Sequence, residues 1–306
     1  MTKLKKDGSK IVNVACVPQR SPFRYPGGKT WLVPQVRRWL SIRRSRPSIL
    51  IEPFAGGGIV SLTAAFEHLA DRVVMVEVDV DVAAVWQCIL GSDGPWLAER
   101  IISFPMSADS VREELLSPPA NLRERAFQTI LRNRTNHGGI LAPGSGLIKH
   151  GENGKGISSR WYPDTLRRRI LDIVQIKDKI TFIQGDGLKV MSNYLDDPDV
   201  VFFVDPPYTA GNRGKRAGRR LYTHNTIDHE ELFKLSGCAV GDVLLTYDYD
   251  EYVIKMAEAH GFSFQPICMK NTHHTTMQEL LICRELDWVE QPRRLGEQSQ
   301  LLLMDV

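Results

Sequence analysis

The sequence has no long hydrophobic run and few cysteines. No apolar stretch in its 306 residues approaches the ~20 residues that a membrane-spanning helix needs. The polar and basic start, residues 1–10, is not followed by the hydrophobic segment of a signal peptide. Five cysteines are scattered without a C-x-x-C spacing: Cys16, Cys88, Cys238, Cys268 and Cys283. Because an odd, dispersed set does not suit a disulfide framework, we expect reduced thiols and a cytoplasmic protein.

The chain also lacks a strong net charge. Its formal charge is +3, so bulk charge alone does not predict a nucleic-acid-binding protein. Hydrophobic residues make up 42% and charged residues 25%, which are ordinary values for a globular protein with a substantial core. The basic residues instead gather in local clusters, at 37–46, 132–134, 160–169 and 213–220. These clusters are candidate phosphate contacts or, alternatively, solvated faces.

Short hydrophobic segments recur along the chain and predict strands. They lie at 48–52, 72–77, 180–184, 200–204, 243–247, 262–268 and 279–284. Helical patterns separate most of them, at 30–40, 59–69, 81–90, 229–238 and 250–260. This alternation predicts an α/β fold with a mostly parallel sheet that is covered on both faces. Because only a short polar loop joins the last two strands, the last strand should be antiparallel.

The stretch 91–179 interrupts the alternation. It contains a helix-like segment at 123–132, a glycine-rich loop at 138–156 and the basic segment 160–169. We expect it to be a helical insert that is separate from the sheet. The remaining chain divides into a flexible basic tail, a catalytic domain in two parts and a C-terminal tail, at 1–20, 21–90, 180–290 and 291–306.

A buried-strand pattern at 200–204 ends in Asp205-Pro206-Pro207-Tyr208. Two prolines cannot continue a strand, so the acid and the ring should lie at its carboxyl end, where open α/β sheets place their active sites. There the Asp205 carboxylate and the Pro206 carbonyl can accept hydrogen bonds from an exocyclic amine, while Tyr208 stacks on a flat ring. The tetrad therefore indicates amino-group methylation of a nucleobase, although the same residues also occur in surface turns.

A glycine turn, Pro53-Phe54-Ala55-Gly56-Gly57-Gly58, lies between a predicted strand and a predicted helix. This arrangement is typical of a nucleotide cradle. Ser61 replaces the third glycine of G-x-G-x-x-G, so the turn favours a smaller ligand such as S-adenosylmethionine (SAM). The next strand ends at Glu77, where an acid can bind ribose hydroxyls or simply be a surface acid.

Three motifs occur in a fixed order along the chain. They are the aromatic-x-Gly-Gly-Lys segment at 23–29, Glu-Pro-Phe-Ala-Gly-Gly-Gly at 52–58, and Asp-Pro-Pro-Tyr at 205–208. Together they resemble the Dam-like (D12 class) site-specific DNA adenine N6-methyltransferases, with weaker echoes at 131–134, 222–225 and 279–282. The resemblance spans about residues 20–286 and implies a Rossmann-like SAM-dependent methyltransferase sheet, with a target-recognition insert and a flipped-out adenine.

The resemblance also implies roles for individual residues. For catalysis it implies the tetrad Asp205, Pro206, Pro207 and Tyr208. For the cofactor SAM it implies Tyr25, Lys29, Phe54, Gly56, Gly58, Glu77, Asp186 and Asp205, among which Asp186 is alternatively a turn residue. The basic clusters nearest these motifs supply the candidate DNA contacts, which are Arg132, Arg134, Arg213, Lys215, Arg216, Arg219 and Arg220.

Several alternatives stay open at this point. The Asn-Val-Pro-x-Gly stretch of Dam proper is replaced by residues 149–156, so its target sequence cannot be carried over. Asp-Pro-Pro-Tyr also serves methyltransferases that act on RNA adenine or a protein amide. A nucleotide- or DNA-binding protein with a dead catalytic centre is a further alternative. His273-His274 lacks a third ligand, so no metal is expected. The expected partner is double-stranded DNA, with a cognate restriction endonuclease or none, as in orphan or phage-type enzymes.

Overall fold

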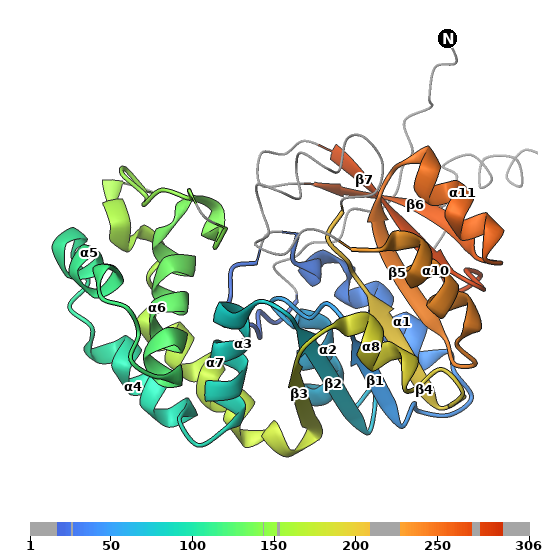
Figure 1. Ribbon diagram of the computed structural model, residues 1–306, viewed down its shortest axis with the longest axis horizontal. Coiled ribbons are helices and arrows are strands. Elements are labelled where there is room, and N and C mark those ends of the chain that lie inside the picture. Colours follow the sequence, from blue (N-terminus) through green and yellow to red (C-terminus); the bar gives the residue numbers. More distant parts are fainter. Residues whose placement is uncertain are drawn as a thin grey trace, which may run out of the picture.

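A seven-stranded sheet forms the centre of the protein (Figure 1). The computed structural model describes residues 17–25, 27–142, 144–151, 154–208, 227–270 and 276–289. The strand order is β3-β2-β1-β4-β5-β7-β6. The strands are β1 (Ile49–Glu52), β2 (Arg72–Glu77), β3 (Ile180–Gln184), β4 (Val200–Val204), β5 (Val243–Asp248), β6 (Ser263–Lys270) and β7 (Thr276–Cys283).

The sheet is parallel except at β7, which pairs antiparallel with both β5 and β6. The predicted α/β class, the mostly parallel sheet and the antiparallel last strand are therefore confirmed. All five residues of β4 are buried, as expected of a central parallel strand that is covered on both faces. Because β1, β2, β3 and β4 run in the same direction, the loops that follow them gather at one edge of the sheet.

Helices cover both faces of the sheet (Figure 1). One hydrophobic core includes buried residues of α1 (Val33–Ser41), α2 (Ile59–Phe66) and α3 (Val80–Leu90). The other includes buried residues of α8 (Gly187–Ser192), α10 (His229–Cys238) and α11 (Glu251–Ala259). The five predicted helices are thus present; α10 has the predicted bounds, and the ends of the other four are shifted by a few residues.

The insert is helical, as expected, and lies at one side of the sheet beside α3 (Figure 1). It contains α4 (Gly94–Ser103), α5 (Ala108–Leu116), α6 (Leu122–Thr135) and α7 (Pro163–Gln175). Helix α3 packs against α6, and α4 packs against α7. Buried residues of α4, α6 and α7 belong to the same hydrophobic core as those of α2 and α3. The expectation of an insert separate from the sheet is therefore wrong in one respect, since the two parts share a core.

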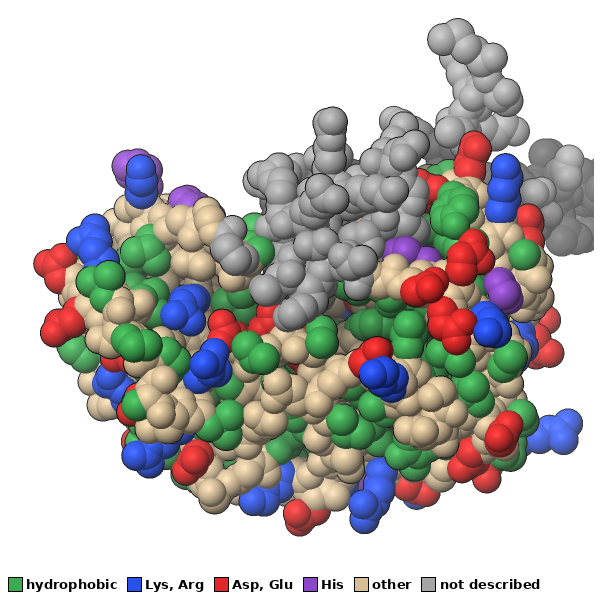
Figure 2. Space-filling view, viewed as in Figure 1, with side chains coloured by type: hydrophobic (Ala, Val, Ile, Leu, Met, Phe, Trp, Pro, Cys, Tyr) green, Lys and Arg blue, Asp and Glu red, His purple; other side chains and the backbone are tan. Residues whose placement is uncertain are grey.

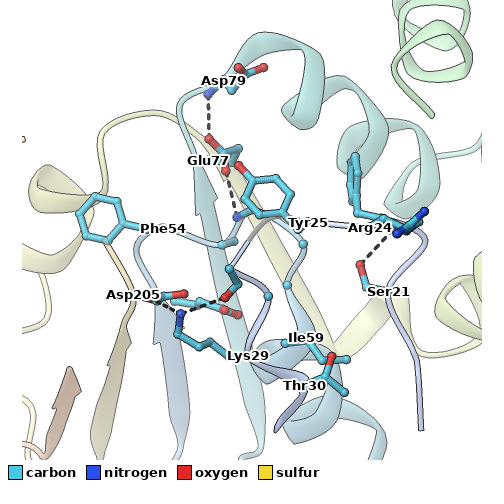
Figure 3. A pocket seen from close by; sticks show the side chains of 18 of the residues that line it. Ser21, Arg24, Tyr25, Lys29, Thr30, Phe54, Ile59, Glu77, Asp79 and Asp205 are labelled. Carbon is cyan, nitrogen blue, oxygen red and sulfur yellow. Dashed lines mark hydrogen bonds and ion pairs between the residues drawn. The ribbon is translucent and has the colours of Figure 1, made fainter. Parts of the chain in front are cut away.

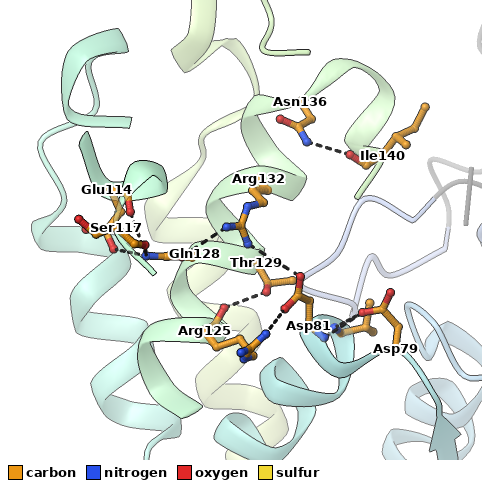
Figure 4. Close-up of polar contacts among 11 residues, drawn as sticks. Asp79, Asp81, Glu114, Ser117, Arg125, Gln128, Thr129, Arg132, Asn136 and Ile140 are labelled. Carbon is orange, nitrogen blue, oxygen red and sulfur yellow. Dashed lines mark hydrogen bonds and ion pairs between the residues drawn. The ribbon is translucent and has the colours of Figure 1, made fainter. Parts of the chain in front are cut away.

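Polar contacts fix the insert to the start of α3 (Figure 4). Asp79 caps this helix by accepting hydrogen bonds from the backbone N–H groups of Asp81 and Val82, at 2.8 and 3.1 Å. The Arg125 guanidinium on α6 pairs with the Asp81 carboxylate at 2.8 Å. Because Asp79 follows β2 by two residues, these contacts place α6 next to the carboxyl edge of the sheet.

Some predicted features lie outside the described residues. They include Arg213, Lys215, Arg216, Arg219 and Arg220, the echo at 222–225, His273-His274, and most of both predicted tails. Within the described ranges, no helix is long and apolar enough to cross a membrane. Cys88, Cys238 and Cys283 are free thiols.

Candidate active site

A cavity of about 1060 Å³ opens at the carboxyl edge of the sheet, between the sheet and the insert (Figure 3). Its wall includes each residue predicted to contact the cofactor: Tyr25, Lys29, Phe54, Gly56, Gly58, Glu77, Asp186 and Asp205. Pro207 and Arg134 also line it, whereas Pro206, Tyr208 and Arg132 do not. The structure thus brings the three sequence motifs together around one cavity.

The glycine turn is shaped by close packing. Gly56 and Gly58 have φ angles of +46° and +62°, in the left-handed region that favours glycine. A Cβ atom on Gly56 would lie 2.6 Å from Cε1 of Tyr25, and one on Gly58 would lie 2.4 Å from Cε of Met75. The Trp86 indole N–H also donates to the Gly56 carbonyl at 2.9 Å. The two glycines are therefore required by the close packing of the Tyr25 ring and of Met75 in the core.

Two buried acids support this turn. Glu77 accepts hydrogen bonds from the backbone N–H of Gly56 and of Asp79, each at 2.9 Å (Figure 3). Glu52 accepts one from the N–H of Ser61 at 3.0 Å. Burial raises the pKa of Glu77 to about 7 and that of Glu52 to about 8. Because an ionised carboxylate has about four acceptor sites, Glu77 can still accept hydrogen bonds from a ribose.

The Asp205 carboxylate is held by three donors. Its Oδ1 atom lies 3.0 Å from Nζ of Lys29, and accepts hydrogen bonds from the hydroxyls of Tyr208 and Thr246 at 2.9 and 2.8 Å. Lys29 is only 3% exposed and reaches Asp205 from the short 3-10 helix, Lys29–Leu32, that precedes α1 (Figure 3). The predicted catalytic acid is therefore fixed in position at the cavity wall.

Sequence reasoning assigned no role to Thr246 and Glu279, which belong to this cluster. Glu279 is buried on β7, and its Oε2 atom lies 3.4 Å from Nζ of Lys29 and 3.3 Å from the Tyr208 hydroxyl. Burial raises the pKa of Glu279 to about 7, although Lys29 opposes this effect. The available signals were Thr246 after a hydrophobic run in β5 and the family echo at 279–282, which begins at Glu279.

Tyr208 faces the protein interior in this structure. Its ring stacks on Tyr247, with centroids 5.7 Å apart and an interplanar angle of 23°. Asp186, by contrast, fits both of its predicted alternatives. It lines the cavity, and it also caps α8 by accepting a hydrogen bond from the N–H of Leu188 at 2.9 Å.

The other basic clusters mostly form internal ion pairs. Arg132 lies 3.9 Å from the Asp81 carboxylate and 3.4 Å from Oε1 of Gln128, so its DNA contact stays a prediction (Figure 4). In the 37–46 cluster, Arg37 pairs with Glu67 at 2.6 Å, and other arginines pair with Asp242 and Asp71. On the face shown in Figure 2, basic and acidic side chains lie interspersed, which fits the mild net charge.

The sheet end of the cavity suits SAM. The volume of the whole cavity is slightly above the range for small-molecule sites, about 300–1,000 Å³. The Asp205 carboxylate lines it, and a negative group favours a ligand that carries a positive sulfonium. The residues present therefore fit this cofactor.

Comparison with known proteins gives a match of one family model to part of the chain and weak structural likenesses. The family model of the D12 class N6 adenine-specific DNA methyltransferases matches residues 25–118. No curated protein matches the sequence.

Three solved structures are similar in part. A candidate RNA methyltransferase from Pyrococcus horikoshii has a TM-score of 0.40 and 11% identity, over 89% of this chain and 94% of that chain. An rRNA methyltransferase from Streptomyces viridochromogenes has a TM-score of 0.38 and 14% identity, over 85% and 86%. The magnesium protoporphyrin IX methyltransferase of Synechocystis, with SAM bound, has a TM-score of 0.34 and 11% identity, over 83% and 78%.

The matched segment begins at Tyr25 and contains Lys29, the glycine turn and Glu77. These residues meet in one cavity with Asp205, which lies beyond the match. Residues 25–118 therefore match the D12 class of N6 adenine-specific DNA methyltransferases, and the protein is a methyltransferase whose cofactor is S-adenosylmethionine.

Proposed function

We propose that the protein is a site-specific DNA methyltransferase that methylates the N6 amino group of adenine. One observation carries this proposal: Asp205, fixed by Lys29, Tyr208 and Thr246, lies in the same cavity as the turn that matches the adenine-specific family. Double-stranded DNA is the partner that this function requires, and a cognate restriction endonuclease is not needed for it.

The chemistry follows from the target amine. The lone pair of the adenine N6 atom is delocalised into the ring, which makes the nitrogen a poor nucleophile. Hydrogen bonds from the amine to the Asp205 carboxylate and the Pro206 carbonyl favour a pyramidal nitrogen with a localised pair. Because Lys29 and Thr246 already orient Asp205, the carboxylate itself needs little reorganisation as the reaction proceeds.

The cofactor side of the cavity positions the methyl donor. Bound SAM supplies an electrophilic methyl group on a positively charged sulfur. Glu77 accepts hydrogen bonds from its ribose, and Tyr25 and Phe54 flank it from the two motifs that precede Asp205. The Asp205 carboxylate at this end favours the positive sulfonium.

The target base must leave the double helix to reach Asp205. Unstacking a base costs a few kcal/mol, which stacking on an aromatic side chain can offset. When the amine takes its place at Asp205, the Tyr208 hydroxyl is displaced from this carboxylate. The Tyr208 ring is then released to stack on the flipped adenine.

A methyl-transfer assay tests the proposal directly. Radiolabelled SAM is incubated with the full chain and with duplex DNA, RNA or denatured protein, and the labelled products are digested and identified by mass. We expect N6-methyladenine from duplex DNA, and no label with the Asp205→Ala variant. Label in RNA or in a protein amide would contradict the DNA assignment, and N4-methylcytosine would contradict the target base.

A further inference from the structure

The insert end of the cavity is lined by arginines. They are Arg24, Arg134, Arg160 and Arg169, from the segment before Tyr25 and from the insert. The acidic residues in the cavity wall, Glu52, Glu77, Asp79, Asp186, Asp205 and Asp228, all come from the sheet domain. Charge is thus segregated along one cavity, with acids near the cofactor motifs and guanidinium groups toward the insert.

Two of these arginines are fixed side by side. The Arg134 guanidinium donates to the Pro22 carbonyl, and that of Arg169 donates to the adjacent Ser21 carbonyl at 3.0 Å. Within the described residues, the Nε atoms of Arg134 and Arg169 are buried without a hydrogen-bond partner. Arg134 is only 4% exposed. A buried cation with an unpartnered donor is unfavourable, and an anion from a ligand would relieve this.

The electrostatics of the cluster agree with its geometry. Burial lowers the pKa of Arg134 to about 9, and the positive charges of Arg169, Arg24 and Arg160 contribute. Burial also lowers the pKa of Arg24, with a further contribution from Arg160. Planar guanidinium groups match the oxygens of a phosphate in pairs, so they suit this anion better than lysines would.

Nearby groups favour a nucleic acid over a small anion. Helix α7 begins at this end of the cavity without a side-chain cap, and Thr165 and Leu166 of its first turn line the wall. The positive end of a helix favours phosphate. Tyr162, which is half exposed, lies in the same wall and can stack on an unpaired base. The carboxylate of SAM carries one negative charge and could offset only one of four guanidinium groups.

We propose that Arg24, Arg134, Arg160 and Arg169 form a binding site for backbone phosphates of the DNA strand that carries the target base. The choice of DNA as the source of the phosphate rests on the proposed function. The same cavity then holds the cofactor and the flipped base near Asp205, while the strand that leads to this base lies against the insert.

Salt-dependent binding tests the site. The variants are Arg160→Gln and Arg169→Gln. The matched control is Arg167→Gln, which removes an exposed charge from the helix that carries Arg169, outside the cavity wall. The dissociation constant of a mixed-sequence duplex is measured at several salt concentrations. Each lost phosphate contact should lower the slope of the logarithm of this dissociation constant against log [salt] by about 0.9. The control should leave the slope unchanged.

Parallel measurements separate the possible failures. Calorimetry should show unchanged SAM affinity for Arg160→Gln; a loss of SAM affinity with an unchanged salt slope would assign the anion to the cofactor and overturn the site. An unchanged slope together with normal methylation of DNA would also overturn it, while the proposed function would stand. If the wild type methylates RNA and not DNA, the proposed function fails, even where the slopes still respond to the arginines.

Discussion

The charged side chains at the two ends of the cavity differ in how completely their hydrogen bonds are satisfied. At the sheet end, Glu77 accepts two backbone hydrogen bonds and Asp205 is contacted by three donors. At the insert end, Arg134 and Arg169 bond to backbone carbonyls but each keeps a buried Nε atom without a partner among the described residues. The acids follow parallel strands, whereas these arginines lie on the helices of the insert.

We infer from this difference that the sheet end serves catalysis and the insert end serves DNA binding. Groups that are already satisfied need little reorganisation during a reaction, which is what a catalytic acceptor requires. Buried cations that have an unpartnered donor are stabilised most when a ligand supplies a negative charge. Substitutions at the sheet end should therefore change turnover or cofactor affinity, and substitutions at the insert end should change DNA affinity and its salt dependence.

The largest expected effect is on turnover at Asp205. In Asp205→Ala the amine loses its charged acceptor in the transition state, so turnover should fall by about a thousandfold. SAM affinity, measured by calorimetry, should remain close to that of the wild type. The control is Asp228→Asn, which changes another carboxylate in the same cavity wall. A similar loss in both variants would show that general electrostatics, and not the position of Asp205, supports the reaction.

A second test at the sheet end concerns the packing of Tyr25 on the glycine turn. In Gly56→Ala a Cβ atom would lie within 2.6 Å of the Tyr25 ring at a φ of +46°. The ring must move, and the left-handed backbone conformation costs about 1–2 kcal/mol, so SAM affinity should fall by about tenfold or more. Calorimetry on Gly56→Ala, Tyr25→Ala and the double variant measures this coupling. Strictly additive losses would contradict a contact between the two residues.

Sequence patterns predicted the sheet well because its strands are short, hydrophobic and β-branched. In β4, five consecutive buried residues end at a proline pair, and this one pattern located both the strand and Asp205. The insert was harder to predict. Helix α7 buries Leu166, Ile170 and Ile173 at helical spacing, but its many arginines obscured this pattern.

The sequence could place residues in the site but not orient their side chains. It placed Tyr208 in the tetrad, yet whether the ring faces a base or Tyr247 depends on tertiary packing. It placed the glycines in a turn, yet their close neighbours, Tyr25 and Met75, lie far away in the sequence. Thr246 and Glu279 joined the site only through the pairing of strands β5 and β7.

Asn133 connects the two ends of the cavity. Its amide accepts a hydrogen bond from the N–H of Arg24 at 2.8 Å, and donates to the carbonyls of Arg24 and Gly139 at 3.0 and 2.8 Å. In Asn133→Ala these buried and half-buried backbone groups lose their partner, so the free energy of unfolding should fall by about 2 kcal/mol. Because Arg24 precedes Tyr25, SAM affinity should also fall severalfold.

The control for this bridge is Asn136→Ala. Asn136 lies just beyond the same helix and donates to the Ile140 carbonyl at 2.9 Å, so its bond stays within the insert. Denaturant titration measures stability, and calorimetry measures SAM binding. If Asn136→Ala weakens SAM binding as much as Asn133→Ala does, the bridge to Arg24 is not what connects the insert to the cofactor.

The last prediction concerns the pH dependence of the free energy of unfolding that arises from Glu52. Burial raises its folded pKa to about 8 from 4.5, so the folded state binds a proton that the unfolded state releases within this window. Stability should therefore fall as pH rises through the window, by up to about 1.4 kcal/mol for each unit of pKa shift. Glu52→Gln keeps an acceptor for the Ser61 N–H but cannot ionise, so its stability should fall less over the same pH range.

The control is Glu67→Gln, because hydrogen bonding to Arg37 lowers the pKa of Glu67 and keeps it ionised throughout the window. Parallel curves for Glu52→Gln and the wild type, from denaturant titrations at several pH values, would show that Glu52 is solvated well enough to ionise without cost.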